Sequence, residues 1–519
     1  MKKVVTDDLI PSMHLAGLNM IASLNKDSNY IPFFNLEVDR EYKGEWKFTH
    51  TSHNIGRWWD CMLRLEEATG FEIPADIEGA MLVNLYRYFD NEACMCMEPE
   101  GLESDVKDML VEHSMRENLL TFYMLIRRRN NCWAKTTAHR MLEGIEHTIN
   151  ESEDNLLASL NYARLLEALV PYYELTGDEL AYRLAERLAN WHYEHTTLPD
   201  GSFPGWPRHS HSYLGTLKGL FLFGKMTGQH KYIDRVYKTY LATVRQIVKE
   251  SGWAAHDIKI VNTTRAETTC PGDAAQLALW LAMEGYSEKC CSISQDCMVT
   301  LLDDAERMVR ARILPSQILE SPEITPIGEG KDRFANLTER MIGAYGGVLT
   351  ETHSGKFPYT DVTAADIHSL ADIYNNIIVE TDTAVRVLFH FNRKVHGVQV
   401  VSKRENGKAV VTVVSTADKH LDIRIPGWAS EETLTVAVNG KAVSPNVQDG
   451  FMRIPSVGGT IQVVISYVLP VRIITETVKN VEYRIQFEGD EITGISPNTD
   501  FYPFYPDLDV RVNKSGGNT

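Results

Sequence analysis

Apolar residues recur at helical spacing through the first 380 residues of the chain. They fall at i, i+3, i+4 and i+7, which is typical of helices with one buried face. The segments with this pattern are 56–68, 77–88, 115–128, 155–175, 179–192, 214–226 and 232–248. Helices that end just before Gly70, Gly177 and Gly228 have a glycine where a left-handed C-cap is needed. We therefore expect an array of helices in the first part of the chain.

Helical hairpins repeat along this array. The stops at Gly177 and Gly228 are each followed by a short turn and another helix start, so the unit recurs about every 50 residues. Stacked hairpins either extend as a solenoid or close into a toroid. Long loops at 198–208, 258–273 and 312–361 interrupt the array unevenly, and long loops in a compact array commonly carry function. We therefore predict an (α/α)6 toroid whose loops surround a central cleft.

The period of the apolar residues changes to two near residue 381. Alternation indicates strands at 383–391, 397–401, 409–414, 421–425, 434–438 and 460–465, with turn residues between them. Short strands joined by hairpin turns are typical of a β-sandwich. The predicted fold is mainly α with a β module: an (α/α)6 toroid at 1–380 and a C-terminal β-sandwich at 381–480. Residues 481–519 are expected to form an extension that packs back and ends in a disordered tail.

Composition limits the classes of partner. The chain has 519 residues and a formal net charge of −18, and phosphate binding needs clustered Lys and Arg, so we expect no nucleic-acid or membrane partner. The N-terminus enters charged sequence without an apolar leader. Neither Cys94 with Cys96 nor Cys290 with Cys291 has paired metal-ligand spacing. A cytoplasmic protein with reduced thiols, and with no metal or other cofactor, fits these features best.

Acidic side chains that suit glycosidic cleavage fall on the predicted cleft loops. Such cleavage needs two carboxyl groups across the scissile bond, or one carboxyl group and another nucleophile. Glu267 lies among Arg265, Cys270 and Asp273 before a helix start, and a nearby arginine would keep a carboxylate ionised. Asp361 lies on the last loop, which closes the toroid and would place it opposite Glu267. Local capping of a helix is the alternative for both carboxylates.

Other polar groups suit the binding of a sugar. His209 and His211 stand at the entrance of an apolar helix, where a capped helix start is the alternative, and Trp206 just before them would supply an aromatic platform. His53 and Arg57 are one turn apart on one face of an amphipathic helix. The predicted substrate-binding residues are His53, Arg57, Trp206, His209, His211, Arg265 and Tyr359.

Short segments also carry a resemblance to a known family. They are Ile423-Arg-Ile-Pro-Gly-Trp428 and Val436-Ala-Val-Asn-Gly440 in the predicted sandwich, the His209-Ser-His211 helix entrance, and Ala266-Glu267-Thr-Thr-Cys270. Through these segments the chain resembles the β-L-arabinofuranosidase-like glycosidases, glycoside hydrolase family 127 and its relatives. The resemblance implies an (α/α)6 barrel followed by β-sandwich modules, a glycosidase activity and an oligosaccharide substrate.

The chain departs from this family at its zinc site. In the family a Glu-Thr-Cys segment and a vicinal cysteine pair supply the zinc ligands, and one cysteine of the pair is the nucleophile. Glu267 matches the glutamate and Cys270 is displaced by one residue, while the pair falls at Val362-Thr363, where no thiol exists. The family's acid/base glutamate falls on the preceding loop, where Asp257 and His256 offer comparable chemistry. The resemblance therefore implies a related glycosidase without the zinc–cysteine mechanism.

Three functions are compatible with these features. The first is a glycoside hydrolase that acts on a plant- or microbe-derived oligosaccharide, with Glu267 and either Asp361 or Asp257 as acid and base. The second is a polysaccharide lyase or unsaturated-uronide hydrolase, in which His209 or His211 and a tyrosine serve as base and acid. The third is a catalytically degenerate glycan-binding protein. The hydrolase is the leading hypothesis; the sugar, the linkage and assembly as a homodimer are left open.

Overall fold

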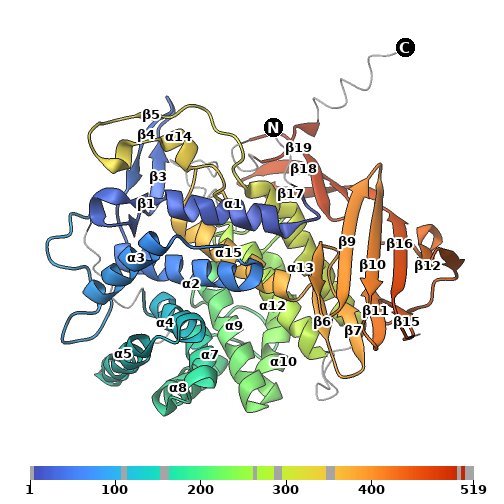
Figure 1. Ribbon diagram of the computed structural model, residues 1–519, viewed down its shortest axis with the longest axis horizontal. Coiled ribbons are helices and arrows are strands. Elements are labelled where there is room, and N and C mark those ends of the chain that lie inside the picture. Colours follow the sequence, from blue (N-terminus) through green and yellow to red (C-terminus); the bar gives the residue numbers. More distant parts are fainter. Residues whose placement is uncertain are drawn as a thin grey trace.

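The computed structural model describes residues 5–106, 114–151, 162, 164–260, 266–285, 295–346, 357–456, 458–499 and 504–508. Figure 1 shows a helical part beside a sandwich of strands, with a small separate sheet, β17 to β19, near both chain ends. No helix in the described part of the chain is long and apolar enough to cross a membrane.

Helices from the first 375 residues form two concentric rings. Each inner helix contacts the next, and the last contacts the first, so the inner ring is closed. The inner helices are α2 (Thr51–Thr69), α4 (Met115–Arg129), α7 (Leu166–Thr176), α9 (Ser210–Thr227), α12 (Thr269–Gly285) and α15 (Thr360–Asn375). Around them pack α1 (Leu9–Ala22), α3 (Ala75–Tyr88), α5 (Cys132–Glu151), α8 (Glu179–His195), α10 (His230–Thr239) and α13 (Gln295–Met308). The predicted (α/α)6 toroid is present.

Glycines end three of these helices as the sequence predicts. Gly70, Gly177 and Gly228 follow α2, α7 and α9 with φ of 75°, 68° and 66°, and each backbone N–H bonds to a carbonyl of the last turn. A side chain with a Cβ rarely adopts this left-handed conformation, so glycine is favoured there. The predicted helix at 232–248 is interrupted, because α10 passes into a π-helical turn (Tyr240–Val244) before the short α11 (Arg245–Ile247).

The loops at the cleft end of the toroid contain short elements. They are β1 (Leu24–Asn25), β2 (Ile31–Pro32), β3 (Asn35–Val38), β4 (Lys43–Lys47), β5 (Thr325–Pro326) and α14 (Leu337–Arg340). A second π-helical turn (Val309–Ile313) follows α13. In the long loop predicted at 312–361, β5 pairs in parallel with β4, so this loop is tied to the N-terminal part of the chain.

Two sheets form the predicted sandwich. One has the order β13-β12-β16-β10-β9-β8 and the other β14-β15-β11-β7-β6. Their strands are β6 (Ile378–Glu380), β7 (Ala384–Val387), β8 (Arg393–Val395), β9 (Val398–Glu405), β10 (Lys408–Ser415), β11 (His420–Arg424), β12 (Thr435–Val438), β13 (Lys441–Val443), β14 (Val447–Gln448), β15 (Phe451–Ile454) and β16 (Ile461–Val468). Alternate residues Ala409, Val411 and Val413 of β10 are buried, which is the period that the sequence showed.

Buried charges attach the sandwich to helix α13. Arg424 of β11 forms ion pairs with Asp303 and Glu306, and its Nε donates to the Leu388 carbonyl at 2.6 Å. Arg310 bonds to Glu306 at 2.9 Å and to the backbone carbonyl of His390. Buried ion pairs with this many partners hold two surfaces in one orientation.

The last sheet packs onto the toroid rather than onto the sandwich core. It consists of β17 (Val471–Val478), β18 (Val481–Glu488) and β19 (Glu491–Ser496), so it begins ten residues before the expected limit at 481. Its apolar residues form a separate cluster with Trp253 and Ala311. Glu476 accepts hydrogen bonds from the Ser251 backbone and hydroxyl at 2.9 and 2.6 Å. The expected disordered tail lies outside the described residues.

Candidate active site

The starts of all six inner helices meet at one end of the ring. The first turns of these helices, the residues just before them and the third turn of α9 supply ionisable side chains at this end. They are His53 and Arg57 (α2), Arg116 and Glu117 (α4), Arg164 and Glu167 (α7), His209, His211 and Lys218 (α9), Glu267 and Asp273 (α12), and Asp361 and Asp366 (α15). The positive end of each helix dipole faces this region, which favours the acidic side chains among them.

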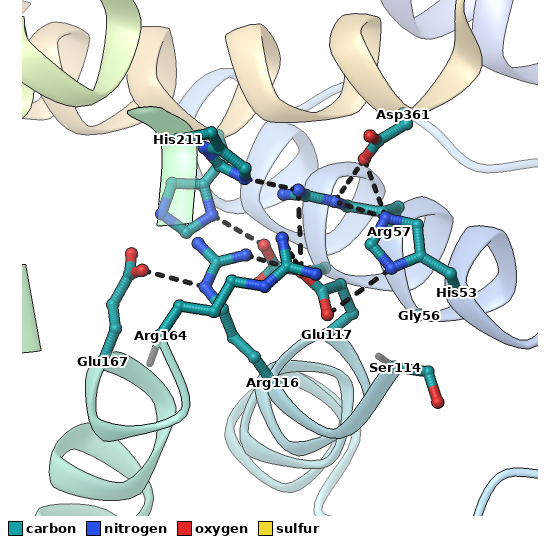
Figure 2. A network of polar contacts seen from close by, with 12 residues as sticks. His53, Gly56, Arg57, Ser114, Arg116, Glu117, Arg164, Glu167, His211 and Asp361 are labelled. Atoms are coloured by element: carbon teal, nitrogen blue, oxygen red, sulfur yellow. Dashed lines mark hydrogen bonds and ion pairs between the residues drawn. The ribbon is translucent and has the colours of Figure 1, made fainter. Parts of the chain in front are cut away.

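A chain of four side chains crosses this end of the ring. Arg57 donates from Nε to Asp361 Oδ1 at 2.5 Å and from a terminal nitrogen to His211 Nε2 at 2.7 Å (Figure 2). Because Arg57 can only donate, His211 Nε2 is an acceptor, so Nδ1 carries the proton and donates to Asp273 Oδ2 at 2.5 Å. His53 Nε2 also contacts Asp361 Oδ1, at 3.0 Å. The hydrogen-bond partner of Asp361 among the described residues is bonded at Oδ1, and none is bonded at Oδ2.

A second layer of buried charges lies beneath this chain. Lys218, which is fully buried, lies 2.8 Å from Glu167 Oε1 and 2.6 Å from Asp273 Oδ1. Arg116 bonds to Glu167 at 2.8 Å and to Glu117 at 2.9 Å (Figure 2). With so many partners, each ion that burial has removed from water is compensated by opposite charge.

Burial and opposite charges together set the pKa values of these carboxyls. Burial alone would raise the pKa of Glu167, but Arg116 and Lys218 lower it to about 2. In the same way Arg57 and His53 hold the pKa of Asp361 well below its usual value against the effect of burial. Burial lowers the pKa of His211 despite its bond to Asp273, in agreement with its neutral form. Glu167 and Asp361 therefore stay ionised at neutral pH, and His211 stays neutral.

Close packing of the inner helices brings this layer together. Gly56 on α2 faces the start of α4, where an added Cβ would lie 2.9 Å from the carbonyl carbon of Glu117. Figure 2 shows Gly56 directly beside Glu117. A larger residue at position 56 would push α2 and α4 apart and move Glu117 away from its partners.

Glu267 forms a second cluster beside the crossing chain. Its Oε2 lies 2.8 Å from His209 Nε2 and 4.0 Å from His256 Nε2, and its Oε1 accepts from Thr269 Oγ1 at 2.8 Å. Burial would raise the pKa of Glu267, but the neighbouring histidines, His209 first, hold it well below the usual value. The His209 ring lies 5.9 Å from that of His211, and Arg57 joins His211 to Asp361, so the two clusters are neighbours.

Asp257 is near this cluster but is held by another partner. A backbone bridge pairs it with His209, and Arg208 contacts its two oxygens at 2.8 and 3.3 Å. Lys259 also donates its backbone N–H to Asp257 Oδ1 at 2.9 Å. Both oxygens of this carboxylate are therefore engaged, in contrast to Asp361.

Asp366 is a buried carboxyl in the second turn of α15. Neither of its oxygens has a hydrogen-bond partner among the described residues. Burial first, and then the charge of Asp273, raise the pKa of Asp366 well above its usual value. Arg312 opposes this shift and Glu267 adds to it. Asp366 is therefore neutral where the other carboxyls are ionised.

The described residues do not fit a zinc ion held by thiolates. Cys270 is fully buried in the first turn of α12, and burial, with Glu267 and Asp273, raises the pKa of its thiol well above the usual value. Its sulfur is not among the potential ligand atoms that lie close to Glu267. Val362 and Thr363, where the resemblance would place a cysteine pair, offer no thiolate. No step of the zinc–cysteine mechanism is open to these residues.

The remaining predicted residues are placed as follows. Trp206 is 58% exposed on the loop before α9, and Tyr359 is the N-cap residue of α15 with its ring 5.5 Å from that of Phe34. Arg265 lies outside the described residues. Substrate binding by these three residues stays a prediction.

Sequence reasoning missed Lys218, Glu117 and Glu167 as parts of the site. Lys218 does carry a signal, because it is a lysine within the apolar helix α9. The pairing of Arg116 with Glu167 carries none, because it joins residues that are far apart in the chain.

Comparisons with known proteins agree on one architecture. Residues 389–465 match the family model of the β-L-arabinofuranosidase GH127 middle domain, which places this match on the sandwich. No curated protein matches the sequence of this chain. A solved glycoside hydrolase is similar with a TM-score of 0.57 at 11% identity, over 85% of this chain and 77% of that one.

Two GH127 enzymes have a similar structure. A GH127 β-L-arabinofuranosidase from Geobacillus stearothermophilus T6 aligns with a TM-score of 0.56 at 14% identity, over 92% of this chain and 80% of that one. A GH127 β-arabinofuranosidase aligns with a TM-score of 0.56 at 12% identity, over 94% of this chain and 81% of that one. At such identities the likeness shows a shared fold, and function has to be inferred from the site.

Proposed function

We propose that this chain, a remote member of the GH127-like proteins, is a glycoside hydrolase that cleaves an oligosaccharide between Asp361 and Glu267. The observation that carries the proposal is that two ionised carboxylates are joined to the surroundings of His211. Arg57 contacts both Asp361 and His211, and His209, which bonds to Glu267, has its ring 5.9 Å from that of His211. Two carboxyl groups across the scissile bond are what glycosidic cleavage requires. The matched GH127 middle domain and the shared fold support the same reaction class.

Asp361 suits the role of base or nucleophile. Arg57 and His53 both hold its Oδ1, which fixes the carboxylate and keeps it ionised. No hydrogen bond joins its Oδ2 to a described residue, and 19% of the side chain is exposed, so this oxygen can face the anomeric carbon or a water molecule. Asp257 is the weaker candidate because Arg208 engages both of its oxygens.

Glu267 and His209 suit the role of proton donor to the leaving sugar oxygen. Because Glu267 is ionised, it accepts at 2.8 Å and His209 Nε2 carries the proton between them. The His209 side chain is 17% exposed, whereas that of Glu267 is 5% exposed, so the histidine lies nearer to solvent. A positioned acid of this kind contributes about 100- to 10,000-fold to a rate.

Arg57, His211 and Trp206 are the groups that would hold the sugar. Arg57 and His211 form a rigid buried floor, because each is fixed by two charged or polar partners. Trp206, with its ring exposed, offers an apolar surface against which a sugar face could stack. Such a platform beside a polar floor is the usual character of a small-molecule site.

A panel of glycosides tests the proposal. Purified protein is incubated with p-nitrophenyl furanosides and pyranosides, β-L-arabinofuranoside first, and with plant and microbial oligosaccharides, and released sugar is measured. We expect hydrolysis of at least one substrate, which Asp361→Asn abolishes without a loss of folded protein.

The same reactions are followed by ultraviolet absorbance. A rise would indicate a lyase that forms a double bond, and a fall would indicate an unsaturated-uronide hydrolase; either contradicts the proposal. Stabilisation by a sugar without turnover across the panel would indicate a glycan-binding protein instead.

A further inference from the structure

Three side chains of the site converge on one point. The potential ligand atoms of His209, His256 and Glu267 all lie within 4.8 Å of one another. Both imidazole Nε2 atoms face the same oxygen, Glu267 Oε2, at 2.8 and 4.0 Å, and the two rings are 4.4 Å apart. In the part of the chain that the structure describes, no other group of His, Cys, Asp or Glu side chains meets this condition.

From this geometry we infer that His209, His256 and Glu267 form a binding site for a divalent transition-metal cation, with zinc as the best-suited ion. Two imidazole nitrogens and one carboxylate oxygen are a ligand set that zinc accepts, with bonds of about 2.0–2.2 Å. Tetrahedral bonds of that length place the ligand atoms about 3.4 Å apart. The distances of 2.8 and 4.0 Å lie on either side of this value, so small side-chain shifts complete the site.

Outer hydrogen bonds orient the ligands. Ser212 Oγ contacts His209 Nδ1 at 2.9 Å, which directs Nε2 toward the cluster, and Thr269 Oγ1 donates to Glu267 Oε1 at 2.8 Å, which leaves Oε2 for the cation. Partners of this kind fix the ring and raise the affinity of a ligand for its metal.

The backbone holds the three ligand segments in register. A bridge pairs residues 209 and 257, another pairs 255 and 266, and the Ser210 N–H bonds to the carbonyl of His256 at 2.9 Å. The ligand positions are therefore set by main-chain bonds between loops that are distant in sequence, and no large rearrangement is needed to gather them.

The site has an open side. The side chains of His209 and His256 are 17% and 22% exposed, so a cation held by three protein atoms keeps room for water or for hydroxyl groups of a sugar. Three protein ligands with an open position are typical of a catalytic rather than a structural zinc site. Cys270 has no part in this ligand set.

The cation and the proton on His209 compete for one nitrogen. Metal binding requires the unprotonated Nε2, so it displaces the proton that His209 shares with Glu267. The inference concerns the site of the proposed hydrolase, but binding is measured without substrate. Failure of the metal site is therefore distinguishable from failure of the proposed activity.

Binding of zinc and cobalt to the full chain tests the inference. Protein with a tag that contains no histidine is stripped with a chelator, and Zn²⁺ is added in equilibrium dialysis. We expect one bound Zn²⁺ per chain, with affinity at least about tenfold weaker in His256→Ala and in Ser212→Ala. His195→Ala removes an exposed histidine on α8 and serves as the control, with unchanged affinity.

Cobalt provides a readout on the unmodified protein. Co²⁺ in a four-coordinate site of nitrogen and oxygen ligands gives visible d–d bands, which we expect in the wild type and in His195→Ala. A thiolate-to-cobalt charge-transfer band would contradict the ligand set by placing Cys270 or another thiol in it. Absence of the visible bands, or zinc affinity that His256→Ala leaves unchanged, would show that the three side chains form a hydrogen-bonded cluster only.

Discussion

Replacement of Lys218 by methionine is expected to destabilise the toroid strongly. The ammonium group is fully buried and lies within 2.8 Å of Glu167 and 2.6 Å of Asp273, and methionine keeps the length of the side chain while it removes the charge. Removing one partner from a buried ion pair costs about 3–5 kcal/mol, because the other partner stays buried without compensation. At about 2 °C per kcal/mol for a large domain, the melting temperature should fall by about 6–10 °C.

The assay is scanning calorimetry at neutral pH, with Lys225→Met as the control. Lys225 lies on the same helix and is exposed, so its loss should change the melting temperature little. If the melting temperature of Lys218→Met falls no further than that of Lys225→Met, the buried ion pairs of Lys218 do not stabilise the toroid as argued. The pH dependence adds a second check, since the pKa of Glu167 is lowered to about 2. Its contribution is present above the unfolded pKa and lost as pH falls toward 2, so the two proteins should converge in acid.

Three further changes test other parts of the structure. Gly56→Ala should cost about 1–3 kcal/mol in thermal unfolding because the added Cβ meets the Glu117 backbone at 2.9 Å, whereas Gly79→Ala, where nothing lies within 4 Å, should be neutral or stabilising; equal effects would contradict the close packing. Asp366→Asn should gain stability relative to the wild type as pH rises above about 4, because the folded wild type holds a proton that its unfolded chain releases; a difference in melting temperature that stays constant with pH would refute this. Trp206→Ala should raise KM for an active glycoside and leave kcat and melting temperature nearly unchanged, because the ring is exposed; an unchanged KM would remove it from the binding site.

The sequence was most informative where local chemistry decides the structure. The left-handed C-caps at Gly70, Gly177 and Gly228 depend on one residue each, and their prediction is confirmed. The change of period near residue 381 likewise predicted the strands of the sandwich. The predicted fold class is confirmed by the shared architecture, and residues 389–465 match the GH127 middle-domain model.

The parts of the site that depend on tertiary contact were not predictable in this way. His256 approaches Glu267 only because backbone bridges align residues 209, 257, 255 and 266, and no local pattern encodes such pairing. The burial of Asp366 without a hydrogen-bond partner likewise depends on the packing of α15, which no local sequence pattern shows. The sequence shows directly that Val362 and Thr363 carry no thiol. It does not show that the imidazole groups of His209 and His256 lie beside Glu267.

Comparison of three single variants on one active glycoside tests the central claim most directly. kcat/KM is measured for the wild type, Asp361→Asn, Glu267→Gln and Asp257→Asn, with circular dichroism to confirm that each is folded. We predict that the first two variants lose at least about 100-fold in kcat/KM while Asp257→Asn keeps most of its activity. Wild-type kcat/KM in folded Asp361→Asn or Glu267→Gln would contradict the assignment of these two carboxylates.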